Sequence, residues 1–187
     1  MKHFFFLMTL VLTVILSSCS GPSTISSRKE MKFGEGTLVL IPMANNAVRV
    51  QYQKDHLYDL PDEWLYVSNK EQAASDMKVE VDEKNQLVKF YDKKGNLLTT
   101  VSAHELVPTK VQDKDAYKAK ISLVSPEDEY LTGLGQFQDG FGNLRGVTRR
   151  LTQVNTQISI PMMLSNKGYG LLWNNYSMVD FNPSDWA

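Results

Sequence analysis

The chain reads YLTGLGQFQDGFGNLRGVTRRLTQVNTQISIPMMLSNKGYGLLWNNYSMVDFNP over residues 130–183. Glycines, side-chain amides, adjacent arginines and aromatic rings are denser here than in any earlier part. Ile158, Ile160 and Met162 alternate with Ser159 and Pro161, a period of two that predicts a strand with one apolar face. Because proline is tolerated mainly at edges and bulges, Pro161 predicts an edge strand or the beginning of a strand. So many polar side chains among apolar strand residues indicate a functional surface.

The same alternation marks the residues before this stretch. Strands are expected at 48–53, 77–81, 87–91, 97–101 and 117–123, and again at 169–173. Asp92-Lys93-Lys94-Gly95-Asn96 and Lys167-Gly168 are expected turns between strands. The apolar run at 64–67 is either a strand buried on both faces or a buried turn of helix. We therefore predict an all-β chain built as an antiparallel β-sandwich, with a closed barrel as the alternative.

The N-terminus carries the pattern of an export signal. A basic start precedes an apolar run from Phe4 to Leu16, which is short for a membrane span of about 20 residues but typical of a secretory signal. Leu16-Ser17-Ser18-Cys19 resembles the bacterial lipoprotein signal, in which the cysteine is lipidated and becomes the new N-terminus. We expect residues 1–19 to be a lipoprotein signal peptide and the protein to be exported and membrane-anchored, periplasmic or at the cell surface. An ordinary cleaved signal is the alternative.

Composition bounds the rest of the chain. Residues 20–36 are rich in serine, lysine and glycine without periodicity, which predicts a flexible tether. Residues 37–187 then suffice for one domain with a real core. The 20 basic residues balance 21 acidic ones, so no basic field exists to attract nucleic acid.

Residue types that perform catalysis are scarce. His56 and His104 are the only histidines beyond the N-terminal run and Cys19 is the only cysteine, so neither a zinc site nor a histidine-based triad is expected. Both histidines are expected to be surface or loop residues. Gly140, Gly142 and Gly146 miss the spacing of a dinucleotide-binding loop. We expect no metal and no cofactor.

The segments GLGQFQDG and NTQISIPMMLSNKGYGLLWNNYSMVDF resemble the N-terminal β-sandwich of glycoside hydrolase family 31, and most closely that of its bacterial α-xylosidases. The resemblance is specific over residues 130–183 and implies a galactose-mutarotase-like supersandwich. In that family the catalytic aspartates belong to a (β/α)8 barrel, which needs roughly 250 residues and would have to follow Ala187. We therefore expect a chain truncated before the barrel, without catalytic residues of its own and inactive alone. Gly133, Gly135, Gly140 and Gly142 are expected to adopt positive φ in tight turns at a sheet end.

The resemblance also implies a carbohydrate-binding surface. Residues 153–157 correspond to a loop that walls the sugar site above the barrel, so Asn155, Thr156 and Gln157 are the candidate substrate-binding residues, with Gln138 and Asp139 beside them. Amides and hydroxyls both donate and accept hydrogen bonds, as sugar hydroxyls require. Asp139 and Asp180 are expected to be structural or substrate-contacting, not a catalytic pair. The expected partners are an α-xyloside or α-glucoside oligosaccharide and the catalytic barrel.

Four aromatic residues are candidates for stacking on a sugar ring. They are Phe137, Phe141, Trp173 and Tyr176. For the last two, a place in the sandwich core is the preferred interpretation. Two other functions stay open: a freestanding, membrane-tethered carbohydrate-binding module, and a periplasmic scaffold without a ligand.

Overall fold

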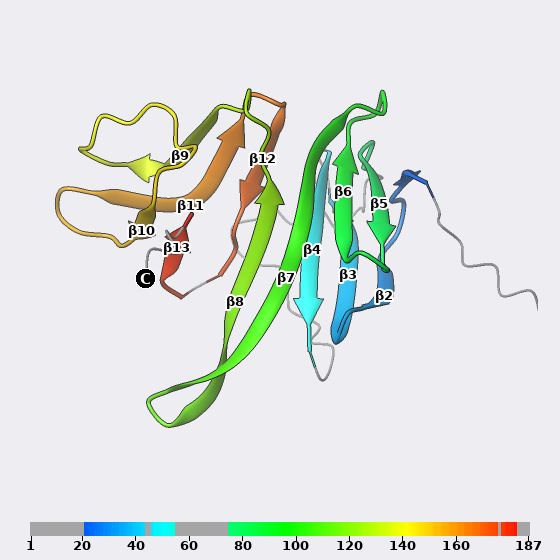
Figure 1. The fold of residues 1–187 in the computed structure, drawn as a ribbon, viewed down its shortest axis with the longest axis horizontal. Coiled ribbons are helices and arrows are strands. Elements are labelled where there is room, and N and C mark those ends of the chain that lie inside the picture. Colours follow the sequence, from blue (N-terminus) through cyan, green and yellow to red (C-terminus); the bar gives the residue numbers. More distant parts are fainter. Residues whose placement is uncertain (1–20, 44–45, 55–74, 176, 183–187) are drawn as a thin grey trace, which may run out of the picture.

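A computed structural model describes residues 21–43, 46–54, 75–175 and 177–182. These residues form strands, turns and loops, and no helix occurs among them (Figure 1). The strands are β1 (Ser23–Thr24), β2 (Lys29–Phe33), β3 (Gly36–Met43), β4 (Ala47–Gln53), β5 (Lys78–Asp82), β6 (Leu87–Tyr91), β7 (Leu97–Val111), β8 (Lys114–Val124), β9 (Leu131–Gln136), β10 (Arg149–Leu151), β11 (Ile158–Ser165), β12 (Tyr169–Leu172) and β13 (Val179–Phe181). The predicted all-β class is confirmed, and each strand pairing in these residues is antiparallel.

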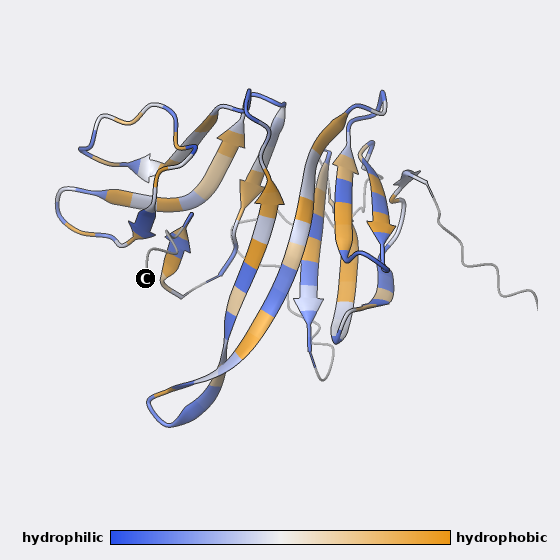
Figure 2. Ribbon diagram, viewed as in Figure 1, coloured by the Kyte–Doolittle hydropathy of each residue, from blue (hydrophilic) through white to orange (hydrophobic). Residues whose placement is uncertain are grey.

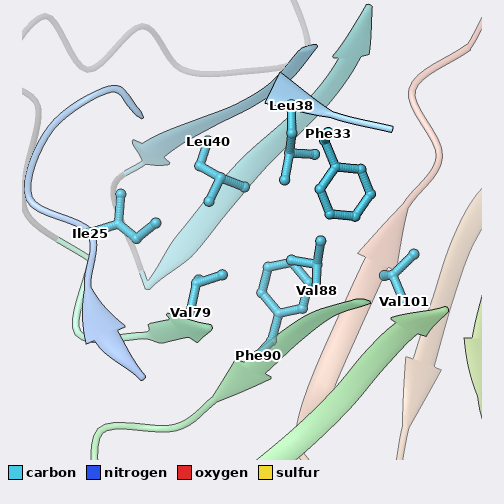
Figure 3. Packing of buried hydrophobic residues seen from close by; sticks show 8 residues of the cluster. All are labelled: Ile25, Phe33, Leu38, Leu40, Val79, Val88, Phe90 and Val101. Carbon is cyan, nitrogen blue, oxygen red and sulfur yellow. The ribbon is translucent and has the colours of Figure 1, made fainter. Parts of the chain in front are cut away.

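Two sheets of the N-terminal half share one core. One sheet has the order β1-β5-β6-β7-β8 and the other β2-β3-β4. The alternation of apolar and polar residues along β5, β6 and β7 is visible as orange and blue bands in Figure 2. Apolar side chains of both sheets, together with Ile25 from the segment between β1 and β2, point toward one another in Figure 3; those of the sheets are Phe33, Leu38, Leu40, Val79, Val88, Phe90 and Val101. This arrangement is consistent with the predicted β-sandwich.

The turn at residues 92–96 confirms the expected hairpin between β6 and β7. The Asp92 carboxylate accepts hydrogen bonds from the backbone N–H and the side-chain amide of Asn96, both at 2.8 Å. Gly95 has a φ of 93°, a left-handed conformation that glycine adopts at little cost. The Lys167-Gly168 turn between β11 and β12 is confirmed as well, with a Gly168 φ of 87°.

The N-terminal boundary of the folded part differs from the expectation. Residues 20–36 were predicted to be a flexible tether, but they contain β1 and β2, and β2 pairs with β3 along its whole length. Ile25 and Phe33 are each only 1% exposed. The prediction was wrong because two large apolar side chains lie among the polar residues of this segment, and their burial stabilises it on the core.

The β7–β8 hairpin is much longer than the sequence predicted. β6 pairs with β7 only as far as Val101, whereas β7 and β8 continue to pair up to Val111 and Lys114. Gln112 and Asp113 connect the two strands with φ values of 49° and 64°, the geometry of a two-residue type I′ turn. The distal half of this hairpin, residues 105–120, projects from the body of the molecule (Figure 1). We call it the ribbon.

Pro161 does not lie at a sheet edge. β11 is the central strand of the sheet β12-β11-β9, so the prediction of an edge strand was wrong. The register between β11 and β9 shifts between Ser159 and Met163, and this bulge accommodates the proline, which has no N–H for a ladder hydrogen bond. Its carbonyl oxygen still accepts a hydrogen bond from the N–H of Trp173 at 2.8 Å.

The glycines of β9 permit this irregular pairing. Gly133 and Gly135 have the expected positive φ, 109° and 99°, but they lie within the strand and not in a tight turn. A Cβ atom at either position would collide with a β11 carbonyl oxygen, that of Met162 or Ile158. Gly140 has the expected positive φ, while at Gly142 a Cβ would lie 2.8 Å from the Tyr130 hydroxyl.

A second, smaller core lies between the β12-β11-β9 sheet and the β10-β13 pair. Leu131, Leu134, Leu144 and Met163 are its buried residues, and Leu151 and Phe181 pack against it from β10 and β13. Several predictions concern residues that the structure does not describe, namely the signal peptide with Cys19, the run at 64–67, His56, Tyr176 and residues 183–187. Among the described ranges, no helix is long and apolar enough to span a membrane.

Candidate functional site

The structure brings the two segments of the predicted sugar-binding surface together. Gln136, the last residue of β9, pairs with Ile158, the first residue of β11. The loop after β9 and the turn before β11 therefore leave the same end of the strand pair, at the left of Figure 1. We call the predicted residues in these two segments the rim; they are Gln138, Asp139, Asn155, Thr156 and Gln157.

The turn before β11 is short and closed. Val154 and Gln157 exchange backbone hydrogen bonds of 3.3 and 3.1 Å, which places Asn155 and Thr156 at the tip with exposed side chains. The Gln157 side chain is half-buried, and its amide Nε2 donates to the Thr152 carbonyl oxygen at 2.7 Å. The tip residues are therefore presented to solvent, whereas Gln157 shapes the turn.

Asp139 anchors the other segment of the rim. Nη2 of Arg149 donates to both carboxylate oxygens of Asp139, at 2.7 and 2.6 Å. Arg149 is only 7% exposed, and its guanidinium carbon lies 4.2 Å from the centroid of the Phe137 ring. The Asp139 carboxylate also accepts the N–H of Phe141 at 3.2 Å. Gln138, between these anchored residues, is exposed.

The neighbouring arginine forms a second ion pair on the other side of its strand. Arg150 contacts Asp180 across the β10–β13 pair, with distances of 2.8 Å from Nε and 3.0 Å from Nη2. This hydrogen-bonded pairing lowers the pKa of Asp180. Asp139 and Asp180 are thus each paired with a different arginine.

A pocket of about 300 Å³ opens beside Asp139 and Arg149. Its lining includes Phe137 and Phe141, as well as backbone of β9 at Gly133 and Gly135. The Phe141 ring is 58% exposed, so it remains available for stacking on a ligand ring. Phe137 and Trp173 are half-buried, and Phe137 packs against the second core.

The sequence analysis missed a buried carboxylate beneath the β11–β12 turn. Glu129 is 3% exposed and accepts hydrogen bonds from the hydroxyls of Ser165 at 2.6 Å and Tyr169 at 2.7 Å. Burial alone would raise the pKa of Glu129. Hydrogen bonds to its carboxylate, of which that from Ser165 contributes most, outweigh burial and hold the pKa of Glu129 below its usual value. Burial, reinforced by Glu129, raises the pKa of Tyr169 to about 12. No spacing rule links Glu129 to residues so distant in sequence.

The position of His104 also differs from the expectation. It was expected at the surface or in a loop, but it lies in β7, half-buried, with ring centroids 5.3 Å from Phe33 and 5.6 Å from Tyr52. Burial lowers the pKa of His104, so at neutral pH it packs as an uncharged ring. Within the described residues, no group of three or more histidine, cysteine, aspartate or glutamate side chains is placed to bind a metal ion.

The fold and the rim together define an all-β domain with a polar, loop-built surface at one end of its C-terminal sheet. A family model described as the glycosyl hydrolase 31 N-terminal galactose mutarotase-like domain matches residues 37–182. The chain belongs to this family. The resemblance inferred from the sequence is thereby confirmed.

Similar proteins are family 31 glycosidases in which this region is a small part. A protein of Pseudescherichia vulneris described as an uncharacterized family 31 glucosidase is 41% identical over 75 residues, which are 38% of this chain and 14% of that protein. An α-xylosidase of Saccharolobus solfataricus is 29% identical over 115 residues, or 57% of this chain and 16% of that protein.

Two solved structures share the fold. They are an α-xylosidase of Xanthomonas citri, with a TM-score of 0.67 and 21% identity over 83% of this chain, and an α-xylosidase from a soil metagenome complexed with xylose, with a TM-score of 0.66 and 24% identity over 86% of this chain. The matches cover 19% and 29% of those two chains. The chain thus spans less than a third of the length of each of these four proteins.

Proposed function

We propose that this chain is the N-terminal carbohydrate-binding domain of an α-xylosidase-like family 31 glycosidase, with the galactose-mutarotase-like supersandwich of that family. In this proposal the rim walls the sugar site of a catalytic (β/α)8 barrel. The observation that carries it is the convergence of two polar segments, 138–139 and 155–157, at one end of the β9–β11 pair. The names of the matched α-xylosidases support the choice of sugar.

The rim residues divide into those that contact the sugar and those that position them. Asn155, Thr156 and Gln138 are exposed and offer neutral donors and acceptors to sugar hydroxyls. Gln157 and Asp139 are already bonded to the Thr152 carbonyl and to Arg149, so they hold the two loops in place. Neutral contacts suit an uncharged ligand, because no charge has to be desolvated on binding.

We expect the chain alone to hydrolyse neither α-xylosides nor α-glucosides. The retaining route requires two carboxyl groups about 5 Å apart, and the two acidic residues of the motif are each bound to a different arginine. The measurement is release of a chromogenic aglycone by the purified chain. Turnover above the blank that persists through purification would place catalytic groups in this domain and contradict the proposal.

The rim is tested in a chimera with a barrel. Residues 21–182 of this chain, which keep the core residues Ile25 and Phe33, replace the matched domain of the Saccharolobus α-xylosidase, and Asn155→Ala and Thr156→Ala are compared with Thr109→Ala on the ribbon. Loss of one hydrogen bond in a desolvated site costs about 1–3 kcal/mol, so kcat/KM should fall about fivefold to 150-fold without a change in Tm. Equal kinetics for all three variants would make the rim part of the scaffold.

We also propose that the protein is exported as a lipoprotein with its anchor on Cys19. The LSSC motif that ends the apolar run supports this. Mass spectrometry of protein extracted from membranes should show Cys19 as a lipidated N-terminus. An unmodified Cys19, or a mature N-terminus beyond it, would contradict the anchor and leave the rim proposal intact.

A further inference from the structure

A second cavity lies in the N-terminal sandwich, on strands that carry no part of the rim. The β2–β3 turn, the end of β4, the β5–β6 turn and the beginning of the ribbon surround it, at the lower end of the sandwich in Figure 1. Its volume is about 550 Å³, within the range of small-molecule sites. It shares no lining residue with the pocket beside Asp139. We call it the sandwich pocket; the lining residues that matter below are Gly34, Glu35, Tyr52, Lys54, Gln86 and His104.

Two aromatic rings line the sandwich pocket. The ring centroids of Tyr52 and His104 are 5.6 Å apart, and both rings pack edge-on with Phe33, which is 1% exposed. Tyr52 and His104 are themselves half-buried, so each ring has one part against the core and another at the cavity. Rings that the core already holds in place can pack on the apolar face of a ligand ring with little further loss of side-chain freedom.

The two ring nitrogens of His104 are in different environments. Nδ1 is buried and has no hydrogen-bond partner among the described residues, a state that costs folding free energy. Because a buried N–H without a partner is rarer in proteins than a buried acceptor without one, we assign the proton of the neutral ring to Nε2. Since Nδ1 is enclosed, Nε2–H is the group that this ring can offer to a ligand.

A side-chain amide lies at another wall of the pocket. Gln86, in the β5–β6 turn, has a φ of 55°, a left-handed conformation that is costly for a residue with a side chain. A Cβ built on Gly34 would lie 3.1 Å from Oε1 and 3.3 Å from Nε2 of Gln86. The amide thus lies directly against the β2–β3 turn, where glycine leaves space for it. Gln86 is exposed, so its donor and its acceptor are available.

The charges of the lining cancel. Nζ of Lys54 lies 2.9 Å from the carboxylate of Glu35. Glu105, where the ribbon begins, is paired with Lys120 at 3.5 Å. Each carboxylate among the described lining residues therefore has its own lysine, and a charged ligand would have to compete with one of these pairs. A neutral ligand with hydroxyl groups would instead find the amide and the imidazole N–H as partners.

We propose that the sandwich pocket is a second carbohydrate site, which binds a neutral sugar ring. One face of the sugar packs on the rings of Tyr52 and His104, Nε2–H of His104 donates to a hydroxyl oxygen, and the Gln86 amide bonds to neighbouring hydroxyls. No charge has to be desolvated on binding. This site lies in the half of the chain to which the rim contributes nothing, so the proposal goes beyond the function of the rim and does not depend on it.

Histidine NMR of the full chain tests the site. The chain has three histidines and the rim has none, so the signals of isotope-labelled His104 report on the sandwich pocket; their loss in His104→Phe assigns them. The free chain should show the Nε2–H tautomer, and methyl α-xyloside or methyl α-glucoside should shift the His104 signals saturably. Glucuronate and glucosamine should bind more weakly, because their charges would be desolvated in the pocket.

A matched pair of glycine variants tests the amide. Gln86 and Gln112 are both exposed and have positive φ values of 55° and 49°, which glycine adopts at little cost. Gln86→Gly should weaken binding of methyl α-xyloside about fivefold, as expected for the loss of one hydrogen bond. Gln112→Gly, at the tip of the ribbon and outside the pocket, should leave the affinity unchanged.

His104→Phe separates a role in binding from a role in the fold. The variant keeps a ring against Phe33 and Tyr52 and removes the unpaired Nδ1, so it should not lower Tm. A marked fall in Tm would show that the imidazole serves the fold and would contradict its assignment as a donor to a ligand.

Three further results would overturn the proposal. They are the absence of a saturable shift of His104 with both neutral sugars, equal affinities of Gln86→Gly and Gln112→Gly, and tighter binding of glucuronate or glucosamine than of the neutral sugars. The last result would assign the pocket to a charged ligand. None of these measurements uses kcat/KM of the chimera, so the rim can fail while the sandwich pocket stands, and the reverse.

Discussion

The N-terminal sandwich and the C-terminal sheets bury their apolar residues in different ways. In the sandwich, two sheets cover one another and share eight buried side chains. Among the described residues of the C-terminal part, the three-stranded sheet covers a core of four buried residues with one face, and the exposed Ile160 and Leu164 lie on the other. Ion pairs of Arg149 and Arg150 tie its loops and short strands together. The sandwich therefore contains the larger core, and the C-terminal part carries the rim that we propose contacts the sugar.

The sharpest test of this contrast compares two phenylalanines. Phe33 is 1% exposed between the two sheets of the sandwich, whereas Phe141 is 58% exposed on the rim loop. We expect Phe33→Ala to lower the free energy of unfolding by about 3–5 kcal/mol, through lost burial and the cavity left behind. Phe141→Ala should change it by less than about 0.5 kcal/mol. Urea titration of both variants measures the difference. Equal losses of unfolding free energy would contradict the view that the sandwich supplies most of the stability.

The adjacent arginines provide the next test, within the C-terminal part. Arg149→Ala removes a buried guanidinium, its two contacts to Asp139 and its stacking on Phe137. Because the Asp139 side chain is 33% exposed, the loss should be about 2–3 kcal/mol, below that of a fully buried pair. Arg150→Ala is the control, since the Arg150 side chain is 61% exposed in its pair with Asp180 and exposed pairs contribute little.

Two measurements test the arginine variants: Tm, and amide hydrogen exchange in the rim loop. Arg149→Ala should also release the loop at 137–141, which increases amide hydrogen exchange there, while Arg150→Ala should not. A larger loss of stability for Arg150→Ala than for Arg149→Ala would reverse the assignment of the two ion pairs.

Glu129 predicts a pH dependence of stability. Its pKa is lowered in the folded chain from 4.5, so the ionised form stabilises the fold above about pH 4.5 and this contribution is lost as the pH falls through the folded value. We expect Glu129→Gln to cost about 1–2 kcal/mol at pH 7, for weakened hydrogen bonds from Ser165 and Tyr169, and less at pH 3.

Asp128 is the matched control for Glu129. It pairs with Lys167 at 2.6 Å, but its side chain is 76% exposed, so Asp128→Asn should have the smaller effect at pH 7. Tm measured from pH 3 to pH 7 tests both variants. A Glu129→Gln protein whose stability follows the unaltered profile would show that Glu129 is not held ionised. At the alkaline end, the raised pKa of Tyr169 stabilises the fold below about pH 10, and this contribution is lost toward about pH 12.

The sequence predicted where strands lie better than it predicted which strands pair with one another. Alternation located β4 to β8, β11 and β12, because residues of one face recur every second position. It did not locate β1, β2, β3, β9, β10 or β13; in β2, one fully buried side chain, Phe33, lies among polar residues. It also failed for Pro161, since whether a strand is central or at an edge depends on partners that lie far away in the sequence.

The site was predictable in outline only. The motif indicated which segments carry the rim, and the structure places these segments at one end of the β9–β11 pair. The sequence did not indicate that Asp139 is bound to Arg149, that His104 packs between aromatic rings, or that Glu129 is buried. Such contacts join residues from different strands, and no local pattern encodes their distance.

The smallest predicted effect divides the rim turn itself. Gln157 donates a hydrogen bond of 2.7 Å to the Thr152 carbonyl, while Asn155 is exposed at the tip. Gln157→Ala should therefore lower the free energy of unfolding by about 1 kcal/mol, and Asn155→Ala by less than about 0.5 kcal/mol. In the chimera the order should reverse for sugar binding, with Asn155→Ala losing more affinity for a substrate-sized xyloside than Gln157→Ala. Thermal unfolding of the chain and titration of the chimera give the two rankings. If Asn155→Ala proves the more destabilising variant, the tip of the turn is part of the scaffold, and the division between presenting and positioning residues does not hold.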